Sequence, residues 1–197
     1  MHRRPFLATL AAAGAGLAAL GGLAACGAPA PANHGRRLSR IGVQLYTVRD
    51  LLAADFDGTL AQVAAIGYDE VELAGYHGRS PSEVASSLQQ HGLDAPSSHV
   101  DYPADSGAWQ RTLDAASAAG HDFVVIPWLP ADARATLDDW RRIADRLNEL
   151  GSAATTNGLR LAYHNHDFEF TPVDGTIPYD VLLGGTDPGL VGFELDV

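Results

Sequence analysis

The sequence contains no lysine and a single cysteine, Cys26, and these two shortages exclude several classes of protein. Its 13 arginines are outnumbered by 24 aspartates and glutamates, which gives a formal charge of −11. Because an acidic chain repels phosphate backbones and anionic headgroups, we expect no nucleic-acid partner and no polybasic membrane surface. One cysteine forms neither an intramolecular disulfide nor a thiolate zinc site, so any metal must be bound by histidines and carboxylates.

Residues 1–25 have the pattern of a signal peptide. Arg3 and Arg4 precede a run of Ala, Leu and Gly that is too weakly hydrophobic to be a good membrane span. The run ends in Leu-Ala-Ala-Cys, which resembles the bacterial lipobox and predicts that Cys26 is lipidated and holds an exported protein on the periplasmic side of a bacterial membrane. The arginine pair resembles a twin-arginine export signal. The alternatives are a general export signal and an incidental cysteine.

After a tether at residues 26–39, short apolar runs alternate with helical patterns, which predicts one folded domain over residues 40–197. Ser80-Pro81-Ser82-Glu83 has the residues of a capped helix start, with proline at the first helical position. Strands that alternate with helices at this spacing must be parallel, with right-handed crossovers. The expected strands lie at residues 41–46, 70–73, 96–100, 123–127, 159–166 and 190–196.

The sequence also lacks the glycine-rich turn that an open nucleotide-binding sheet carries after its first strand. A (β/α)8 barrel instead collects polar residues at the carboxyl ends of many strands, where its active site lies. We therefore predict an α/β fold, a TIM barrel with about six strand–helix units, and a fragment of a longer protein, because a complete barrel takes about 250 residues. The polar strand-end residues, each of which could also cap a helix or meet water, are Gln44, Glu72, His99, His164, His166 and Asp196.

The last two expected strands carry residues typical of a metal site. His164 and His166 are two positions apart and so share one face of a strand, and Glu169 follows three residues later. Together with Asp196 they form a set that suits one divalent metal, Mn, Mg, Co or Zn, with open positions for substrate oxygens. The alternative is a pair of histidines hydrogen-bonded inside a polar barrel end.

Four stretches resemble the sugar phosphate isomerase/epimerase family, which has a xylose isomerase-like TIM barrel. They are residues 42–50, 67–73, 163–170 and 187–197. The resemblance implies a divalent metal at the barrel mouth, with Asp196 as a ligand from the sixth strand and His164, His166 or Glu169 as candidates from the fifth. It also implies a histidine from a seventh strand and a glutamate from an eighth, which would follow Val197.

The resemblance implies a metal-dependent sugar isomerase or epimerase. A divalent ion on a carbonyl and an adjacent hydroxyl stabilises the enediolate formed when a neighbouring C–H is deprotonated, and a carboxylate then moves the proton. Glu72, His99 and Glu169 are the candidate catalytic residues. Gln44 and Trp128 are candidates for binding a small carbohydrate, the tryptophan by stacking on a sugar ring, and packing is the alternative role.

Three other functions fit parts of this pattern. A lyase or hydrolase acting on keto-sugars or glycosides shares the first proton transfer. A lipid-anchored sugar-binding protein would keep the barrel without turnover. A metal-dependent phosphodiesterase related to endonuclease IV also shares the barrel, but the acidic charge disfavours it because such an enzyme needs a basic groove for DNA.

Overall fold

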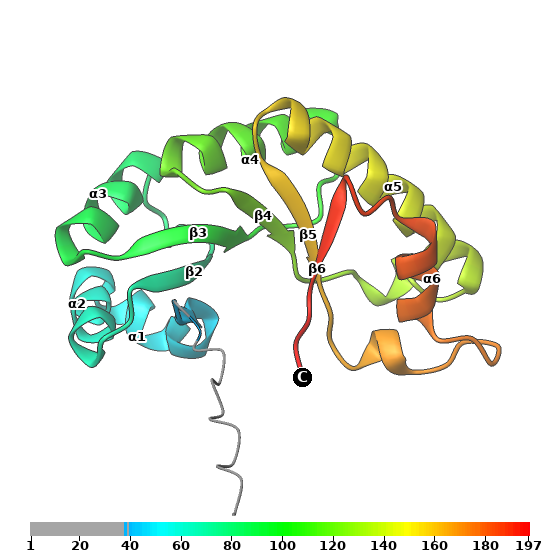
Figure 1. The fold of residues 1–197 in the computed structure, drawn as a ribbon, viewed down its shortest axis with the longest axis horizontal. Helices are drawn as coiled ribbons and strands as arrows, with labels where there is room; N and C mark the ends of the chain where they lie inside the picture. Colours follow the sequence, from blue (N-terminus) through cyan, green and yellow to red (C-terminus); the bar gives the residue numbers. More distant parts are fainter. Residues whose placement is uncertain (1–37, 39) are drawn as a thin grey trace, which may run out of the picture. The chain divides into compact units, whose positions relative to one another are not determined.

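The structure is a computed structural model that describes Leu38 and residues 40–197 (Figure 1). The predicted signal peptide and Cys26 lie outside the described residues. Within the described part of the chain, no helix combines the length and the apolar character needed to cross a membrane.

Six parallel strands form one sheet in which every strand lies beside the next one in the chain. This order is that of a barrel wall, because a doubly wound sheet reverses its strand order at a switch point. The predicted partial barrel is confirmed. The strands are β1 (Gly42–Gln44), β2 (Glu70–Ala74), β3 (Asp94–His99), β4 (Phe123–Ile126), β5 (Arg160–His164) and β6 (Val191–Glu194).

Helices connect the strands, and α3, α4 and α5 lie along the convex side of the curved sheet (Figure 1). Such one-sided cover is what right-handed crossovers produce when they all turn in the same direction. The α-helices are α1 (Arg49–Ala54), α2 (Phe56–Ile66), α3 (Pro81–His91), α4 (Ser106–Ala119), α5 (Leu137–Thr156) and α6 (Pro178–Gly185). Three short 3₁₀ helices are η1 (Leu45–Val48), η2 (Ala131–Ala133) and η3 (Phe168–Phe170).

The predicted start of α3 is confirmed by a capping box. The Glu83 N–H donates to Ser80 Oγ at 3.3 Å, and the Ser80 N–H donates to Glu83 Oε2 at 2.7 Å. Thr136 and Asp139 form the same reciprocal pair at the start of α5. Caps of this kind stabilise a helix by about 1 kcal/mol each, so both helix starts are fixed locally.

The helix-facing side of the sheet is packed into two apolar clusters, one under α1 to α3 and the other under α4 and α5. The helical stripes expected from the sequence are buried, with Trp109 and Leu113 on α4 and Trp140 and Leu147 on α5 each at most 2 % exposed. Trp109 Nε1–H also donates to the carbonyl of Leu150 at 3.1 Å, which ties α4 to α5. This packing holds the strand ends in place from behind.

Three strands end two residues earlier than the sequence pattern predicts, and these boundary predictions were wrong. β1 ends at Gln44, because its side-chain oxygen accepts the Tyr46 N–H and begins η1. β5 ends at His164 and β6 at Glu194. His166 and Asp196 therefore lie in the segments after their strands.

In the described part of the chain, β1 and β6 each have a neighbouring strand on one side only. The outer edges of these two strands are unpaired, and none of the described α-helices α3 to α5 covers the inner face of the sheet (Figure 1). We therefore predict that the 197-residue chain is poorly stable alone. We expect a free energy of unfolding below the roughly 5–15 kcal/mol of ordinary domains. Urea denaturation followed by circular dichroism measures it, and a cooperative transition within that range would contradict the prediction.

Candidate metal and substrate site

Three side chains with metal-binding atoms meet at the carboxyl end of the sheet. His99, His164 and Glu194 are the last residues of β3, β5 and β6, and one donor atom of each lies within 4.8 Å of the others. His164 and Glu194 are also direct partners in the β5–β6 register. The parallel ladder thus sets how these groups are spaced.

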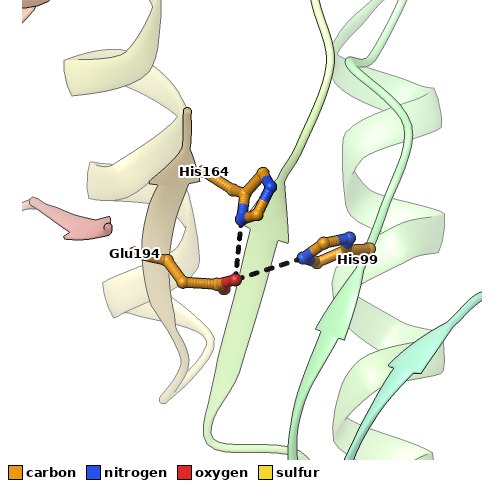
Figure 2. Close-up of side chains that lie close together, drawn as sticks. All are labelled: His99, His164 and Glu194. Carbon is orange, nitrogen blue, oxygen red and sulfur yellow. Dashed lines mark hydrogen bonds and ion pairs between the residues drawn. The ribbon is translucent and has the colours of Figure 1, made fainter. Parts of the chain in front are cut away.

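The carboxylate of Glu194 lies between the two imidazoles, as Figure 2 shows. Its Oε1 lies 2.8 Å from His164 Nδ1 and 3.5 Å from His99 Nε2, and the two ring centroids are 5.0 Å apart. The side chains of both histidines are almost buried. One carboxylate therefore contacts two almost buried imidazoles.

Glu72, on β2, is a second carboxylate beside His99. Its Oε1 lies 3.0 Å from His99 Nε2, and its Oε2 accepts a hydrogen bond of 2.6 Å from Ser97 Oγ, its partner across the β2–β3 ladder. The structure thus brings together Glu72 and His99, two of the three predicted catalytic residues. Ser97 was not identified from the sequence.

The charges at this site shift two pKa values in opposite directions. Burial disfavours the charged form of His99, but Glu194 and Glu72 outweigh it and raise the pKa of His99 to about 9. Burial also disfavours ionised Glu194, but His99 and His164 outweigh it and lower the pKa of Glu194 to about 2. At neutral pH, His99 is therefore protonated between two carboxylates.

His166 and Asp196 lie next to the cluster. Asp196 Oδ2 is 3.7 Å from His164 Nε2, and the ring centroids of His164 and His166 are 5.1 Å apart. Trp128 meets the His166 ring edge-on at 5.2 Å and is 52 % exposed. The accessible ring of Trp128 is thus separated from the cluster only by His166.

The structure does not bring Glu169 to the cluster. Glu169 is fully buried, and it accepts hydrogen bonds from Tyr163 Oη at 2.5 Å and from the His166 N–H at 2.8 Å. Burial and the neighbouring carboxylate raise the pKa of Tyr163, so its hydroxyl stays a donor. Both carboxylate oxygens of Glu169 are occupied in holding the turn after β5.

A cavity of about 1130 Å³ opens over the strand ends. Gln44 contributes a buried Nε2 that has no hydrogen-bond partner among the described residues. Of the described charged groups in the cavity wall, Asp101, Glu194 and Asp196 are acidic, and Arg111 is the one arginine. The predicted site residues that line the cavity are Gln44, His99, Trp128, His164, His166 and Asp196.

The cluster fits a divalent metal. His99 Nε2 is buried and makes no well-aligned hydrogen bond with the described residues, although two carboxylates lie close to it. Two imidazoles and a carboxylate are also a donor set that Zn²⁺, Mn²⁺ and related ions accept. The set differs from the predicted one, since it contains His99 and Glu194 in addition to His164.

Glu194 is the one member of the cluster that was not predicted from the sequence. The available signal was the alternation of β6, where Gly192, Glu194 and Asp196 fall on one face, as residues two positions apart do in a strand. A carboxylate inside an otherwise apolar final strand was a second signal. The sequence pattern predicts Asp196 as the strand-end residue, but Glu194 occupies that position.

Residues 60–181 match the protein family described as the xylose isomerase-like TIM barrel. Inosose dehydratase 2 of Bacillus cereus is 25 % identical in an alignment of length 161 that covers 72 % of this chain and 53 % of that protein. An inosose dehydratase of Bacillus anthracis is 24 % identical over the same shares of both chains. The chain spans about half the length of the curated relatives it matches.

Two solved structures show the same fold. A sugar phosphate isomerase/epimerase from Parabacteroides distasonis superposes with a TM-score of 0.72 at 25 % identity, over 83 % of this chain and 67 % of that one. An AP endonuclease, family 2, from Brucella melitensis superposes with a TM-score of 0.53 at 16 % identity, over 81 % of this chain and 69 % of that one. The second likeness concerns the fold alone.

Proposed function

Because the chain belongs to the xylose isomerase-like TIM barrel family, we propose that it is a divalent-metal-dependent enzyme that acts on a small carbohydrate by proton transfer next to a carbonyl. Isomerisation or epimerisation is the reaction we favour. The observation that carries the proposal is the convergence of His99, His164 and Glu194 at the carboxyl ends of three parallel strands. That end of the sheet is where barrel enzymes of this kind have their active sites.

His99, His164 and Glu194 would hold the metal, and we assign Asp196 as a further ligand because its exposed carboxylate lies 3.7 Å from His164 Nε2. A bound divalent ion polarises a carbonyl and makes the neighbouring C–H more acidic. Glu72 is the residue we assign to proton transfer, because its Oε1 faces the cluster while Ser97 holds its Oε2. A carboxylate fixed at one oxygen presents the other to the cluster in a defined place.

The cavity wall favours an uncharged sugar over a phosphorylated one. Apart from the proposed metal, the described wall offers a phosphate a single arginine, Arg111, beside the acidic Asp101, Glu194 and Asp196. The exposed face of Trp128 suits the apolar face of a sugar ring, and the unpaired Nε2 of Gln44 can donate to a hydroxyl oxygen. We therefore propose a free or glycosidic sugar as the substrate.

A second candidate reaction is elimination of water. The observation that favours it is the similarity to inosose dehydratases, whose name states that they remove water. Elimination begins with the same removal of a proton next to a carbonyl, so the site described above serves it without rearrangement. A sugar-binding protein without turnover is the third candidate.

Solvent deuterium exchange separates these candidates. The chain, loaded with Mn²⁺, Mg²⁺, Co²⁺ or Zn²⁺, is incubated in D₂O with free, glycosidic and 3-keto sugars. Deuterium at a carbon of an isomerised or epimerised sugar supports our proposal, and loss of water supports the dehydratase. Binding without exchange favours the sugar-binding protein, and a chain that retains none of these metals contradicts the proposed function.

Metal binding is expected to release a proton at neutral pH. His99 has a pKa of about 9, and an imidazole must be neutral to bind a metal, so below pH 9 the ion displaces a proton. Calorimetric titration with Zn²⁺ in buffers of different ionisation enthalpy should give about one proton at pH 7 and progressively fewer above pH 9. Unchanged proton release at pH 7 in His99→Gln would contradict this assignment.

We also propose that the chain is an exported lipoprotein anchored through Cys26, which rests on the Leu-Ala-Ala-Cys motif after the apolar run. Metabolic labelling with an alkyne analogue of palmitate in a bacterial host should label the chain. Cys26→Ser should abolish the label, because it removes the only cysteine sulfur. Equal labelling of the two proteins, or none in the parent, would rule out the anchor.

A further inference from the structure

Asn165 lies between the two histidines of the site, and its side chain bonds to the main chain of Asp196 in both directions. Asn165 Nδ2 donates to the Asp196 carbonyl oxygen at 2.9 Å, and the Asp196 N–H donates to Asn165 Oδ1 at 3.1 Å. Asn165 is only 2 % exposed. A primary amide can provide a donor and an acceptor at once, which is what this arrangement requires.

These two hydrogen bonds lie where the ladder between β5 and β6 ends. The register of β5 and β6 ends with the pair His164 and Glu194, so the ladder no longer holds the chain at Asp196. The side-chain amide of Asn165 bonds there to a main-chain N–H and a main-chain carbonyl, the two groups that a neighbouring strand would have paired. It thereby extends the connection between the two strands beyond the last ladder pair.

The carboxylate of Asp196 depends on this main-chain anchor. Its side chain is 64 % exposed, so packing does little to orient it, and its contact with the cluster is the 3.7 Å approach to His164 Nε2. With its main-chain N–H and carbonyl both held by Asn165, Asp196 retains mainly side-chain rotation. Its carboxylate then stays beside His164, one of the residues that would hold the metal.

We infer that Asn165 is a positioning residue that holds Asp196 in place as a metal ligand. The inference rests on the proposed function, because it requires that the cluster bind a metal. Asn165 does not itself contact the metal position. Asn165 acts through the main chain of Asp196. Substitution of Asn165 should therefore make Asp196 more mobile while leaving its carboxylate present.

The chain offers a closely matched control in Asn148. Asn148 Nδ2 donates to the Gly185 carbonyl oxygen at 2.9 Å, and the Asp187 N–H donates to Asn148 Oδ1 at 2.7 Å. This is the same two-way bond between an amide side chain and the main chain, but it joins α5 to the segment that precedes β6, away from the strand ends. Asn148→Leu therefore removes equivalent hydrogen bonds without touching Asp196.

The test measures the affinity of the whole chain for Mn²⁺ and Zn²⁺ by calorimetry, together with the unfolding midpoint of each variant. Asn165→Leu keeps the branched shape of the side chain, removes both bonds and should weaken metal binding about 10- to 100-fold, the range found for residues that orient ligands. Asn148→Leu should leave the affinity within about twofold of the parent, since additive losses of stability do not reach a distant site. Should Asn165→Leu fail to fold, Asn165→Ser provides a smaller side chain whose hydroxyl is too short to make both bonds.

A double substitution decides whether Asn165 acts through Asp196. In the Asp196→Ala background, Asn165→Leu should cause no further loss of affinity, because the ligand it positions is already absent. Full additivity of the two losses, or parental affinity in Asn165→Leu, would overturn the inference while leaving the proposed function intact. A parent chain that binds neither Mn²⁺ nor Zn²⁺ would overturn both.

Discussion

Glu194→Gln is expected to lower the affinity of the chain for Mn²⁺ or Zn²⁺ by at least about 100-fold, the upper end of the losses seen when a residue that merely orients a ligand is removed. The substitution keeps the shape of the side chain and removes the charge that lies between His99 and His164. Any metal-dependent turnover should fall in parallel. Calorimetric titration and a steady-state assay on the same preparation measure both effects.

The same substitution should lower the pKa of His99, since Glu194 is one of the two carboxylates that raise it. Proton release on metal binding should therefore decrease at pH 7. Glu149→Gln is the matched control, because Glu149 is an exposed residue of α5 that pairs with Arg146 at 2.7 Å. Parental metal affinity in Glu194→Gln would show that the cluster is not the metal site.

Leu147→Ala is expected to destabilise the chain by about 2–5 kcal/mol, the usual result of cutting a large side chain out of a close-packed core. Leu147 is fully buried on α5, in the cluster behind β4, β5 and β6. The sheet of the described residues has two edge strands, and we expect the chain to have little stability to lose, so the variant should be largely unfolded at 25 °C. Urea denaturation compared with the parent measures the loss.

Leu183→Ala provides the control for this prediction. Leu183 lies on α6 and is 48 % exposed, so removing the same atoms should cost well under half as much. Similar losses in the two variants would mean that α5 is not packed against the sheet as described. In that case the positions of His164 and Glu194 would also be in doubt, since they depend on β5 and β6 being held from behind.

The fold was predictable because it depends on patterns that repeat along the chain. Each of these patterns indicates one type of secondary structure, and together they indicate one strand order. Examples are the capping box at Ser80, the apolar strand around Val124 and the buried apolar face of α5 that includes Leu147. Such agreement between local preference and global arrangement is typical of sequences that fold reliably. The strand ends were less predictable, because a side-chain bond such as that of Gln44 can end a ladder where the sequence pattern continues.

The site was predictable in part. His164 and His166 line one cavity, as predicted, although His166 lies after the end of β5 and not on the strand. The sequence pattern could not separate a carboxylate that faces this cavity from one that is buried behind it. Glu169 follows the histidines closely in sequence and yet points into the core, where Tyr163 and the His166 N–H satisfy it. Glu194 was missed because the sequence pattern continues to Asp196, so Asp196 was given the strand-end position that Glu194 occupies.

The register between β5 and β6 determines whether the site forms. Because His164 and Glu194 are opposed residues of one ladder, sliding β6 by a single residue would bring Phe193 or Leu195 opposite His164 and turn the carboxylate to the other face. Strand slippage would therefore abolish metal binding in one step, without any change of sequence. Metal affinity thus reports on the alignment of two neighbouring strands, and a bound ion would in turn lock that alignment by stabilising one register against all others.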